Sequence, residues 1–243
     1  MAKSDGLSAD KKAERLGVGK MSEGLSVDKK APLVSPLAGV ERKIIDANVG
    51  RFPPWIETYH LTLLTIPWTA GLIGAGWLAR VSLHWLWLSS LMMFLQWFTD
   101  SFDGALGRYR NTGLRKWGFL MDHFLDFVFM TAAFVQYAFI LPEPSRYVLL
   151  AVAFVYDALM VNSWLSFAAT DQFKITYLGM GPTEIRLLFI ILNTCLIFFG
   201  VGFLTVSLPY VLVVFSLLAC FIVWRTQKGV WALDMEIKRR GEP

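Results

Sequence analysis

The stretch LTLLTIPWTAGLIGAGWLA, residues 61–79, decides the class of fold because it is 19 residues long and holds no charged side chain. A helix needs about 20 predominantly apolar residues to cross the hydrocarbon core of a bilayer. The stretch LLFIILNTCLIFFGVGFLT, residues 187–205, has the same length and is equally free of charge. Two such runs in one chain predict a protein that crosses a membrane several times.

The distribution of charged residues supports this prediction. Residues 55–224 hold only 8 of the 23 Lys and Arg residues and 9 of the 19 Asp and Glu residues. A composition with 55% hydrophobic residues excludes a disordered chain, a collagen-like chain and a small disulfide scaffold. We expect an all-α protein with six transmembrane helices, and Pro209 should mark the turn before the last of them. The expected spans are residues 60–79, 82–103, 117–141, 147–169, 186–205 and 208–226.

Lys and Arg residues also predict the orientation, because they gather in cytoplasmic loops. If the N-terminus is cytoplasmic, 21 of the 23 basic residues lie in cytoplasmic segments, and only Arg80 and Arg146 lie outside. Both termini are therefore expected in the cytoplasm. The same distribution explains the net charge of +4 without a nucleic-acid partner.

The segments outside the spans differ in character. Residues 1–35 are polar and contain a repeat, GLSADKKA at 6–13 and GLSVDKKA at 24–31, which is too short for a repeat fold, so we expect a flexible tail. Residues 36–54 carry apolar side chains at roughly helical spacing, which predicts an amphipathic helix on the membrane surface. A plain polar linker is the alternative there. Residues 55–226 form the predicted six-helix domain, and residues 227–243 a basic cytoplasmic tail.

Four aspartates fall within 27 positions of the apolar block, where an ionised group costs at least ~2.5–3.5 kcal/mol to insert. Each pair of aspartates shares a helix face with glycine. The first face, at i, i+3, i+4 and i+7, carries Asp100, Asp103, Gly104 and Gly107. The second face, at i, i+4 and i+8, carries Gly118, Asp122 and Asp126. If the two helices pack face to face, the four carboxylates converge.

Convergent carboxylates in a medium of low dielectric need compensating cations. Hard oxygen ligands select Mg²⁺, Mn²⁺ or Ca²⁺ over Zn²⁺, and a pair of such ions suits phosphoryl chemistry. Glycines on the same faces leave room for a bulky ligand, and Arg108 can bind a phosphate through two hydrogen bonds. A six-span transporter with the aspartates along a cation path is the alternative. Asp157, alone on the fourth expected span, is interpreted as a structural partner of another polar group.

The spacing of these residues resembles the signature of the CDP-alcohol phosphotransferases, also called phosphatidyltransferases, which are integral membrane enzymes of phospholipid synthesis. That signature, D-x2-D-G-x2-A-R-x8-G-x3-D-x3-D, corresponds to residues 100–126. Gly107 stands in place of its Ala, and nine residues instead of eight separate Arg108 from Gly118, whereas Arg110 would leave seven. Loops tolerate insertions best, so we keep Arg108 in the motif. The departure makes a catalytically degenerate family member a further alternative.

The resemblance implies an enzyme that moves a substituted phosphate group from a CDP-linked alcohol to an acceptor hydroxyl and releases CMP. It implies two divalent cations, Mg²⁺ or Mn²⁺, and a site near the cytoplasmic face. Their implied ligands are Asp100, Asp103, Asp122 and Asp126. The residues implied in binding the CDP part are Asp100, Gly104, Gly107, Arg108 and Gly118. Asp126 would also be the general base, and His123 is an auxiliary catalytic candidate unless its ring points away from the aspartates.

Shorter similarities concern the branch of the family and the substrates. Pro53-Pro54-Trp55-Ile56, Asp122-His123 and Gly181-Pro182-Thr183-Glu184 resemble elements of the choline and ethanolamine phosphotransferases, although Tyr59-His60 stands where those enzymes have Pro-Asn. Those enzymes also carry additional spans, so the donor stays open between CDP-diacylglycerol and a CDP-aminoalcohol. The expected partners are this donor, an alcohol or lipid acceptor, membrane lipids and, as is common in the family, a second copy of the chain.

Overall fold

The computed structural model describes residues 37–112, 114–170 and 181–241, and every regular element among them is helical, which confirms the all-α prediction. The repeat at 6–13 and 24–31 lies outside the described residues. The α-helices are α2 (Ala38–Asn48), α3 (Thr58–Leu63), α4 (Thr65–Leu78), α5 (Leu86–Arg110), α6 (Arg115–Ala138), α7 (Glu143–Thr170), α8 (Pro182–Phe199) and α9 (Gly202–Arg240). Two short 3-10 helices are η1 (Val49–Arg51) and η2 (Leu83–Trp85).

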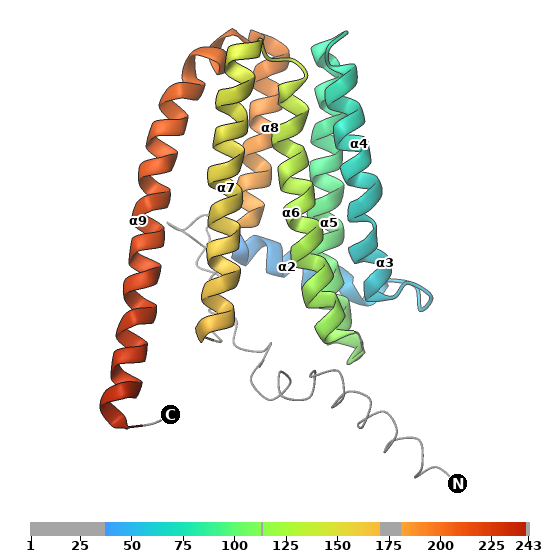
Figure 1. Cartoon of the computed structure of the whole chain (residues 1–243). Coiled ribbons are helices and arrows are strands. Elements are labelled where there is room, and N and C mark those ends of the chain that lie inside the picture. Colours follow the sequence, from blue (N-terminus) through green and yellow to red (C-terminus); the bar gives the residue numbers. More distant parts are fainter. Residues whose placement is uncertain (1–36, 113, 171–180, 242–243) are drawn as a thin grey trace, which may run out of the picture.

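Five helical segments are long and apolar enough to cross a membrane, so the chain has the character of a multi-pass membrane protein. They are Thr58–Leu78, which combines α3 and α4, Lys116–Ala138, Glu143–Thr170, Pro182–Phe199 and Gly202–Arg240. The remaining expected span corresponds to α5, which has 25 residues and packs against α4 and α8 within the bundle (Figure 1). A sixth crossing by α5 and the cytoplasmic location of both termini stay predictions.

The turn between the last two helices corrects the sequence prediction. We expected the turn at Pro209, but α8 ends at Phe199 and Gly200 adopts a left-handed φ of 75°, which is costly for residues with a side chain. Pro209 instead lies inside α9. Proline is tolerated in membrane helices because neighbouring groups satisfy the freed backbone carbonyl. α9 then continues through residues 227–240, where the sequence predicted a tail.

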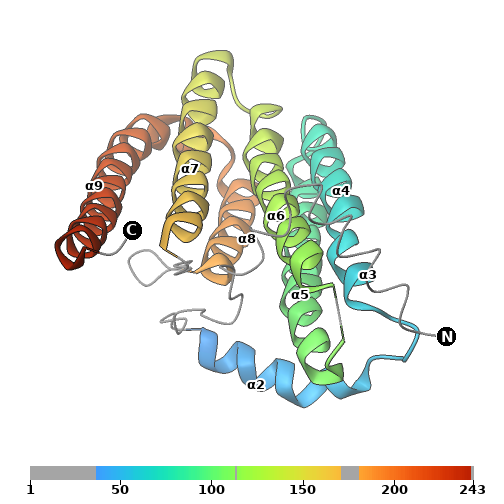
Figure 2. The ribbon, with the colours of Figure 1, turned by 60° about the horizontal axis from the view of Figure 1, so that its bottom comes forward.

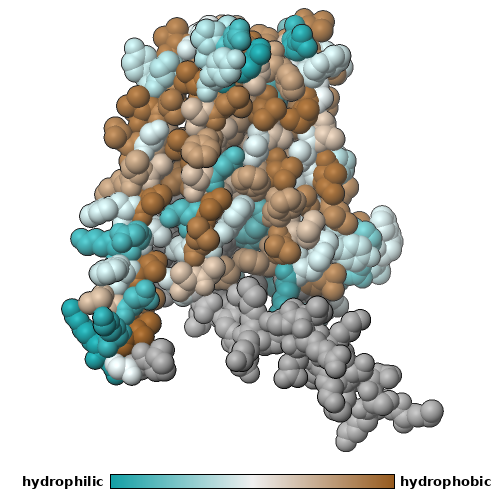
Figure 3. Space-filling model, in the orientation of Figure 1, coloured by the Kyte–Doolittle hydropathy of each residue, from teal (hydrophilic) through white to brown (hydrophobic). Residues whose placement is uncertain are grey.

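The core of the bundle is apolar and is shared by α4 to α9. Leu72, Met93, Phe129 and Leu196 are fully buried in it. A Cβ on Gly76 of α4 would lie 2.7 Å from the Cα of Gln136 on α6, so glycine permits this close approach of the two helices. Large apolar side chains also cover much of the outside of the bundle, with hydrophilic residues gathered toward its two ends (Figure 3). This pattern is the one that lipid contact requires.

A helix is present where the sequence predicts an amphipathic one. Figure 2 shows α2 running across the end of the bundle at which α5 ends and α6 begins. Val40 and Ile44 are exposed, whereas Val49 in η1 is buried against the α5 residues Phe102 and Leu106. The location of α2 at a membrane surface stays a prediction.

Candidate active site

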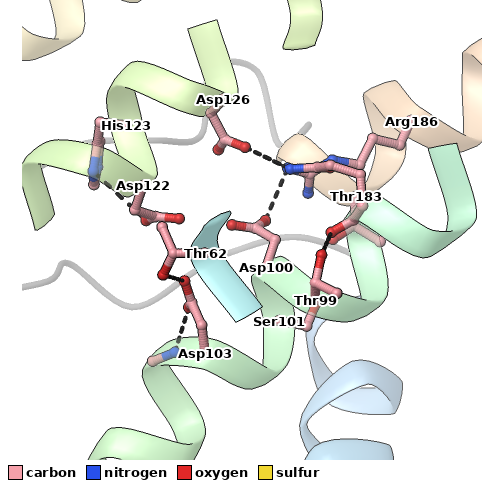
Figure 4. Close-up of polar contacts among 12 residues, drawn as sticks. Thr62, Thr99, Asp100, Ser101, Asp103, Asp122, His123, Asp126, Thr183 and Arg186 are labelled. Atoms are coloured by element: carbon pink, nitrogen blue, oxygen red, sulfur yellow. Dashed lines mark hydrogen bonds and ion pairs between the residues drawn. The ribbon is translucent and has the colours of Figure 1, made fainter. Parts of the chain in front are cut away.

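Three of the four motif aspartates converge, as the helical spacing predicted. Asp100 on α5 and Asp122 and Asp126 on α6 each offer one carboxylate oxygen, and these oxygens lie within 4.8 Å of one another. All three residues are partly buried, and Figure 4 shows their carboxylates turned toward a common space. Because Asp122 and Asp126 are one helical turn apart, they lie on the same face of α6.

The fourth carboxylate, that of Asp103, lies next to this group but is held by other residues. The Thr62 hydroxyl of α3 donates a hydrogen bond of 2.8 Å to Oδ2 of Asp103, and the backbone N–H of Gly104 donates to Oδ1. Asp103 is buried, and Figure 4 shows it turned toward Thr62. The structure thus joins α3 to the motif through an aspartate that sequence reasoning had assigned to the metal ligands.

Arg186 of α8 is part of the acidic cluster, which the sequence did not predict. Its Nη2 lies 2.8 Å from Oδ2 of Asp100 and 3.0 Å from Oδ1 of Asp126, and its side chain is 4% exposed. Gln96 of α5 donates a further hydrogen bond of 2.7 Å to Oδ1 of Asp126. The sequence prediction placed Arg186 at the start of an expected span and counted it among the basic residues that report topology, so this role was missed. The available signal was Pro182, which starts α8 four residues earlier and so places Arg186 inside the helix.

The donor set fits a hard divalent cation. The cluster presents carboxylate oxygens, the ligand type that Mg²⁺ and Mn²⁺ prefer. Arg186 contacts only one oxygen of Asp100 and one of Asp126, so Oδ1 of Asp100 and Oδ2 of Asp126 lie outside its ion pairs. One positive charge beside three carboxylates also leaves an excess of negative charge, which favours a further cation.

Open space adjoins two of the motif glycines. Among the described residues, a Cβ on Gly118 would meet nothing within 4 Å, and a Cβ on Gly104 would meet only Nη1 of Arg108, at 3.3 Å. At Gly107 a Cβ would lie 3.1 Å from the carbonyl oxygen of Thr112 in the turn after α5. An alanine at position 107 would crowd the turn after α5, which belongs to the loop with the extra residue. Glycine avoids this contact.

The two candidate arginines have different surroundings. Arg110 donates hydrogen bonds to three carbonyl oxygens of the segment before α3, at 2.6 Å to Ile56, 2.9 Å to Phe52 and 3.0 Å to Pro53. Arg108 is exposed, with its guanidinium close to Gly104 and thus on the side of the open space. The geometry therefore makes Arg110 a structural residue, and the motif role of Arg108 stays a prediction.

His123 lies beside the cluster, whereas Asp157 has a partner elsewhere in the bundle. Nδ1 of His123 lies 3.6 Å from Oδ2 of Asp122 and 2.7 Å from the carbonyl oxygen of Phe119 (Figure 4). A carbonyl oxygen only accepts, so Nδ1 carries the hydrogen and Nε2 of the neutral ring is an acceptor. Asp157 of α7 accepts hydrogen bonds of 3.2 and 3.3 Å from Thr131 of α6, which is a contact between helices away from the cluster.

A sequence model of the CDP-alcohol phosphatidyltransferases matches residues 59–228, about 70% of the chain. The chain belongs to this family. The matched range contains the carboxylates, the glycines and both arginines described above. No curated protein and no solved structure matches the chain.

Membership of the CDP-alcohol phosphatidyltransferase family establishes the general activity. The chain is a membrane transferase of phospholipid synthesis that acts on CDP-linked alcohols, and the family uses divalent metal ions. The cluster of Asp100, Asp122 and Asp126 is an acidic group of the kind that such ions require.

We expect Arg108→Ala and Arg110→Ala to separate substrate binding from stability in this transferase. Arg108→Ala should lower CMP release by about tenfold or more, since a hydrogen bond to a charged group contributes about 1.5–3 kcal/mol, and should leave the melting temperature in detergent unchanged. Arg110→Ala should lower the melting temperature, because three carbonyl oxygens lose their donor. Unchanged CMP release by Arg108→Ala, or no loss of stability in Arg110→Ala, would contradict this assignment.

Proposed function

We propose that the protein transfers a substituted phosphate group from either CDP-diacylglycerol or a CDP-aminoalcohol to an acceptor hydroxyl and releases CMP. We further propose that two divalent cations, Mg²⁺ or Mn²⁺, bind at its aspartates. The proposal depends on one observation: in a chain of this family, three carboxylates converge beside two glycines that face open space. The proposed metal ligands are Asp100, Asp103, Asp122 and Asp126.

The CDP part of the donor binds on the glycine side of the cluster. Gly104 and Gly118 leave room for it, and Arg108 neutralises charge on its diphosphate through paired hydrogen bonds. Asp100 and Gly107 complete the proposed binding residues. When bound at the four aspartates, two divalent cations would neutralise negative charge on the diphosphate and stabilise the charge that develops on the attacking and leaving oxygens.

Asp126 is the proposed general base. Gln96 and Arg186 both hold its Oδ1, which orients the carboxylate and leaves Oδ2 to take the proton of the acceptor hydroxyl. The acceptor oxygen then forms a bond to the phosphorus farther from the cytidine. The bond from that phosphorus to the oxygen shared with the second phosphate breaks, and CMP leaves with this oxygen. His123, whose Nε2 can accept a proton, is the auxiliary group.

The proposal includes the place of the site in the membrane. With α5 as the sixth crossing and both termini in the cytoplasm, the acidic cluster lies near the cytoplasmic face, where a CDP-linked donor would be found. Helix α2 then lies along the same face. Membrane lipids surround the bundle, and a homodimer stays a prediction.

The structure gives less support to a cation path through the bundle. Farther along α5, α6 and α8 lies a buried network in which Tyr137 donates to Asn193 and Asn193 donates to Ser89. Between this network and the acidic cluster each helix contributes a buried apolar side chain, and these are Met93, Met130 and Phe189. An apolar layer of this kind opposes the passage of ions.

Substitution of the aspartates tests the proposed chemistry. Asp122→Asn and Asp126→Asn should each lower CMP release by about a hundredfold or more, since a general base alone contributes about 10²–10⁴-fold. Asp157→Asn is the matched control, because Asp157 lies in the same bundle but contacts Thr131 instead of the cluster. Release should be measured in detergent with Mg²⁺ or Mn²⁺, with CDP-diacylglycerol and CDP-aminoalcohols screened against acceptor alcohols. Full activity in both cluster variants would contradict the mechanism, and cation uptake into proteoliposomes without CMP release would favour a transporter.

A methyl group at Gly118 tests where the donor binds. Gly118→Ala should raise the KM for the CDP-linked donor by about tenfold, which corresponds to about 1.4 kcal/mol. It should not lower the melting temperature, because the new Cβ meets nothing within 4 Å and alanine is the better helix former by about 1 kcal/mol. Gly229→Ala on α9, where a Cβ also meets nothing, is the control and should leave the KM unchanged. An unchanged KM in Gly118→Ala would exclude close approach of the donor to this glycine.

A further inference from the structure

Glu41 of α2 bridges the two helices that carry Asp100 and Arg186. Oε1 of Glu41 accepts a hydrogen bond of 2.7 Å from the Ser101 hydroxyl on α5. Oε2 accepts one of 3.0 Å from the Thr183 hydroxyl on α8. Ser101 follows Asp100 directly, and Thr183 precedes Arg186 by about one helical turn. The Glu41 side chain thus links α5 next to Asp100 with α8 close to Arg186, the two residues that form the ion pair.

A second side chain, that of Glu184, links the first turn of α8 to the start of α2. Oε2 of Glu184 accepts a hydrogen bond of 2.9 Å from the N–H of Gly181, which caps the helix. Oε1 of Glu184 accepts one of 3.2 Å from the N–H of Leu37, the residue before α2. The segment Gly181-Pro182-Thr183-Glu184, noted in the sequence only for its resemblance to other enzymes, therefore fastens the start of α8 to the start of α2.

Arg186 depends on this placement because one nitrogen serves two carboxylates. Nη2 alone makes the contacts of 2.8 Å to Asp100 on α5 and 3.0 Å to Asp126 on α6. A shift of α8 relative to α5 by a fraction of a helical turn would lengthen at least one of them. Arg186 is buried, so losing a partner there is costly.

We propose that Glu41 is a positioning residue that acts through Arg186. By holding the first turn of α8 against α5, it keeps Arg186 between Asp100 and Asp126 and so sets the spacing of the carboxylates that bind a divalent cation. The inference rests on the proposed function in one respect, namely that these carboxylates are metal ligands. Groups that orient metal ligands in this way typically change metal affinity by about 10–100-fold when they are removed.

Helix α2 offers a matched control for Glu41. Asp46 has the same charge and lies on the same helix, but its carboxylate is 71% exposed and is 3.8 Å from exposed Arg42. An exposed pair of this kind contributes little stability. Asp46→Ala therefore removes the same charge from α2 without removing a contact between α5 and α8.

The experiment is a Mn²⁺ titration of the full-length protein in detergent, followed by electron paramagnetic resonance of the free ion. We expect Glu41→Ala to raise the dissociation constant for Mn²⁺ by about tenfold and Asp46→Ala to leave it unchanged. Glu41→Gln should stay close to wild type, because its amide oxygen accepts from Ser101 and its amide N–H donates to the Thr183 hydroxyl. In an Arg186→Gln background, Glu41→Ala should cause no further loss of affinity, since the residue through which it acts is gone.

Three results would overturn the inference. The first is wild-type Mn²⁺ affinity in Glu41→Ala, the second is an equal loss in Asp46→Ala, and the third is an undiminished effect of Glu41→Ala in the Arg186→Gln background. If Glu41→Ala does not fold, Thr183→Val removes one of the two hydrogen bonds and should shift Mn²⁺ affinity in the same direction. Wild-type protein that binds Mn²⁺ but releases no CMP would contradict the proposed function while these comparisons still decide the role of Glu41.

Discussion

The repulsion among three carboxylates at the end of an apolar helix bundle is the constraint that shapes the surrounding structure. Asp100, Asp122 and Asp126 bring their oxygens within 4.8 Å of one another. In a medium of low dielectric this arrangement persists only with compensating charge and hydrogen bonds. Arg186 provides the charge, and Gln96 provides a hydrogen bond to Asp126. Both donors come from helices packed against the carboxylates, so the packing of the bundle and the electrostatics of the site depend on each other.

The helices around the cluster are held near it by specific side-chain contacts. Helix α3 binds the adjacent carboxylate through Thr62, and Arg110 holds the segment that leads into α3 by its carbonyl oxygens. Helix α2 contacts both α5 and α8 through Glu41. On the side of the cluster toward the centre of the bundle, buried apolar side chains such as Met93 and Phe189 separate it from the polar network around Asn193. The site is thus confined to one end of the bundle, with open space at Gly104 and Gly118.

Short-range patterns in the sequence predicted the fold class and the convergence of several aspartates. Charge-free runs gave the helical membrane class, and the spacing of Asp122 and Asp126 by four residues placed both carboxylates on one face of α6. Contacts between distant residues were beyond such patterns. The ion pair of Arg186 with Asp126 joins residues 60 positions apart, and Arg186 stood at the edge of an expected span, where arginine usually reports topology.

The structure differs from the sequence prediction at two other places. The bond from Thr62 to Asp103 spans 41 positions, so the sequence could not show that this carboxylate turns toward α3. The turn expected at Pro209 occurs at Gly200, because a positive φ ends α8 while a membrane helix accommodates the proline. A contact between distant residues decided the first case, and the local backbone geometry of Gly200 decided the second.

The central claim is that Asp100, Asp122 and Asp126 together bind a divalent cation next to Arg186. Anomalous diffraction from crystals of the protein grown with Mn²⁺ and CDP tests it most directly. The account predicts a Mn²⁺ peak at about 2.0–2.6 Å from a carboxylate oxygen of each of the three residues, the range for hard divalent cations. Crystals that contain CDP in its site but show no anomalous peak among these carboxylates, with Arg186 alone between Asp100 and Asp126, would contradict it.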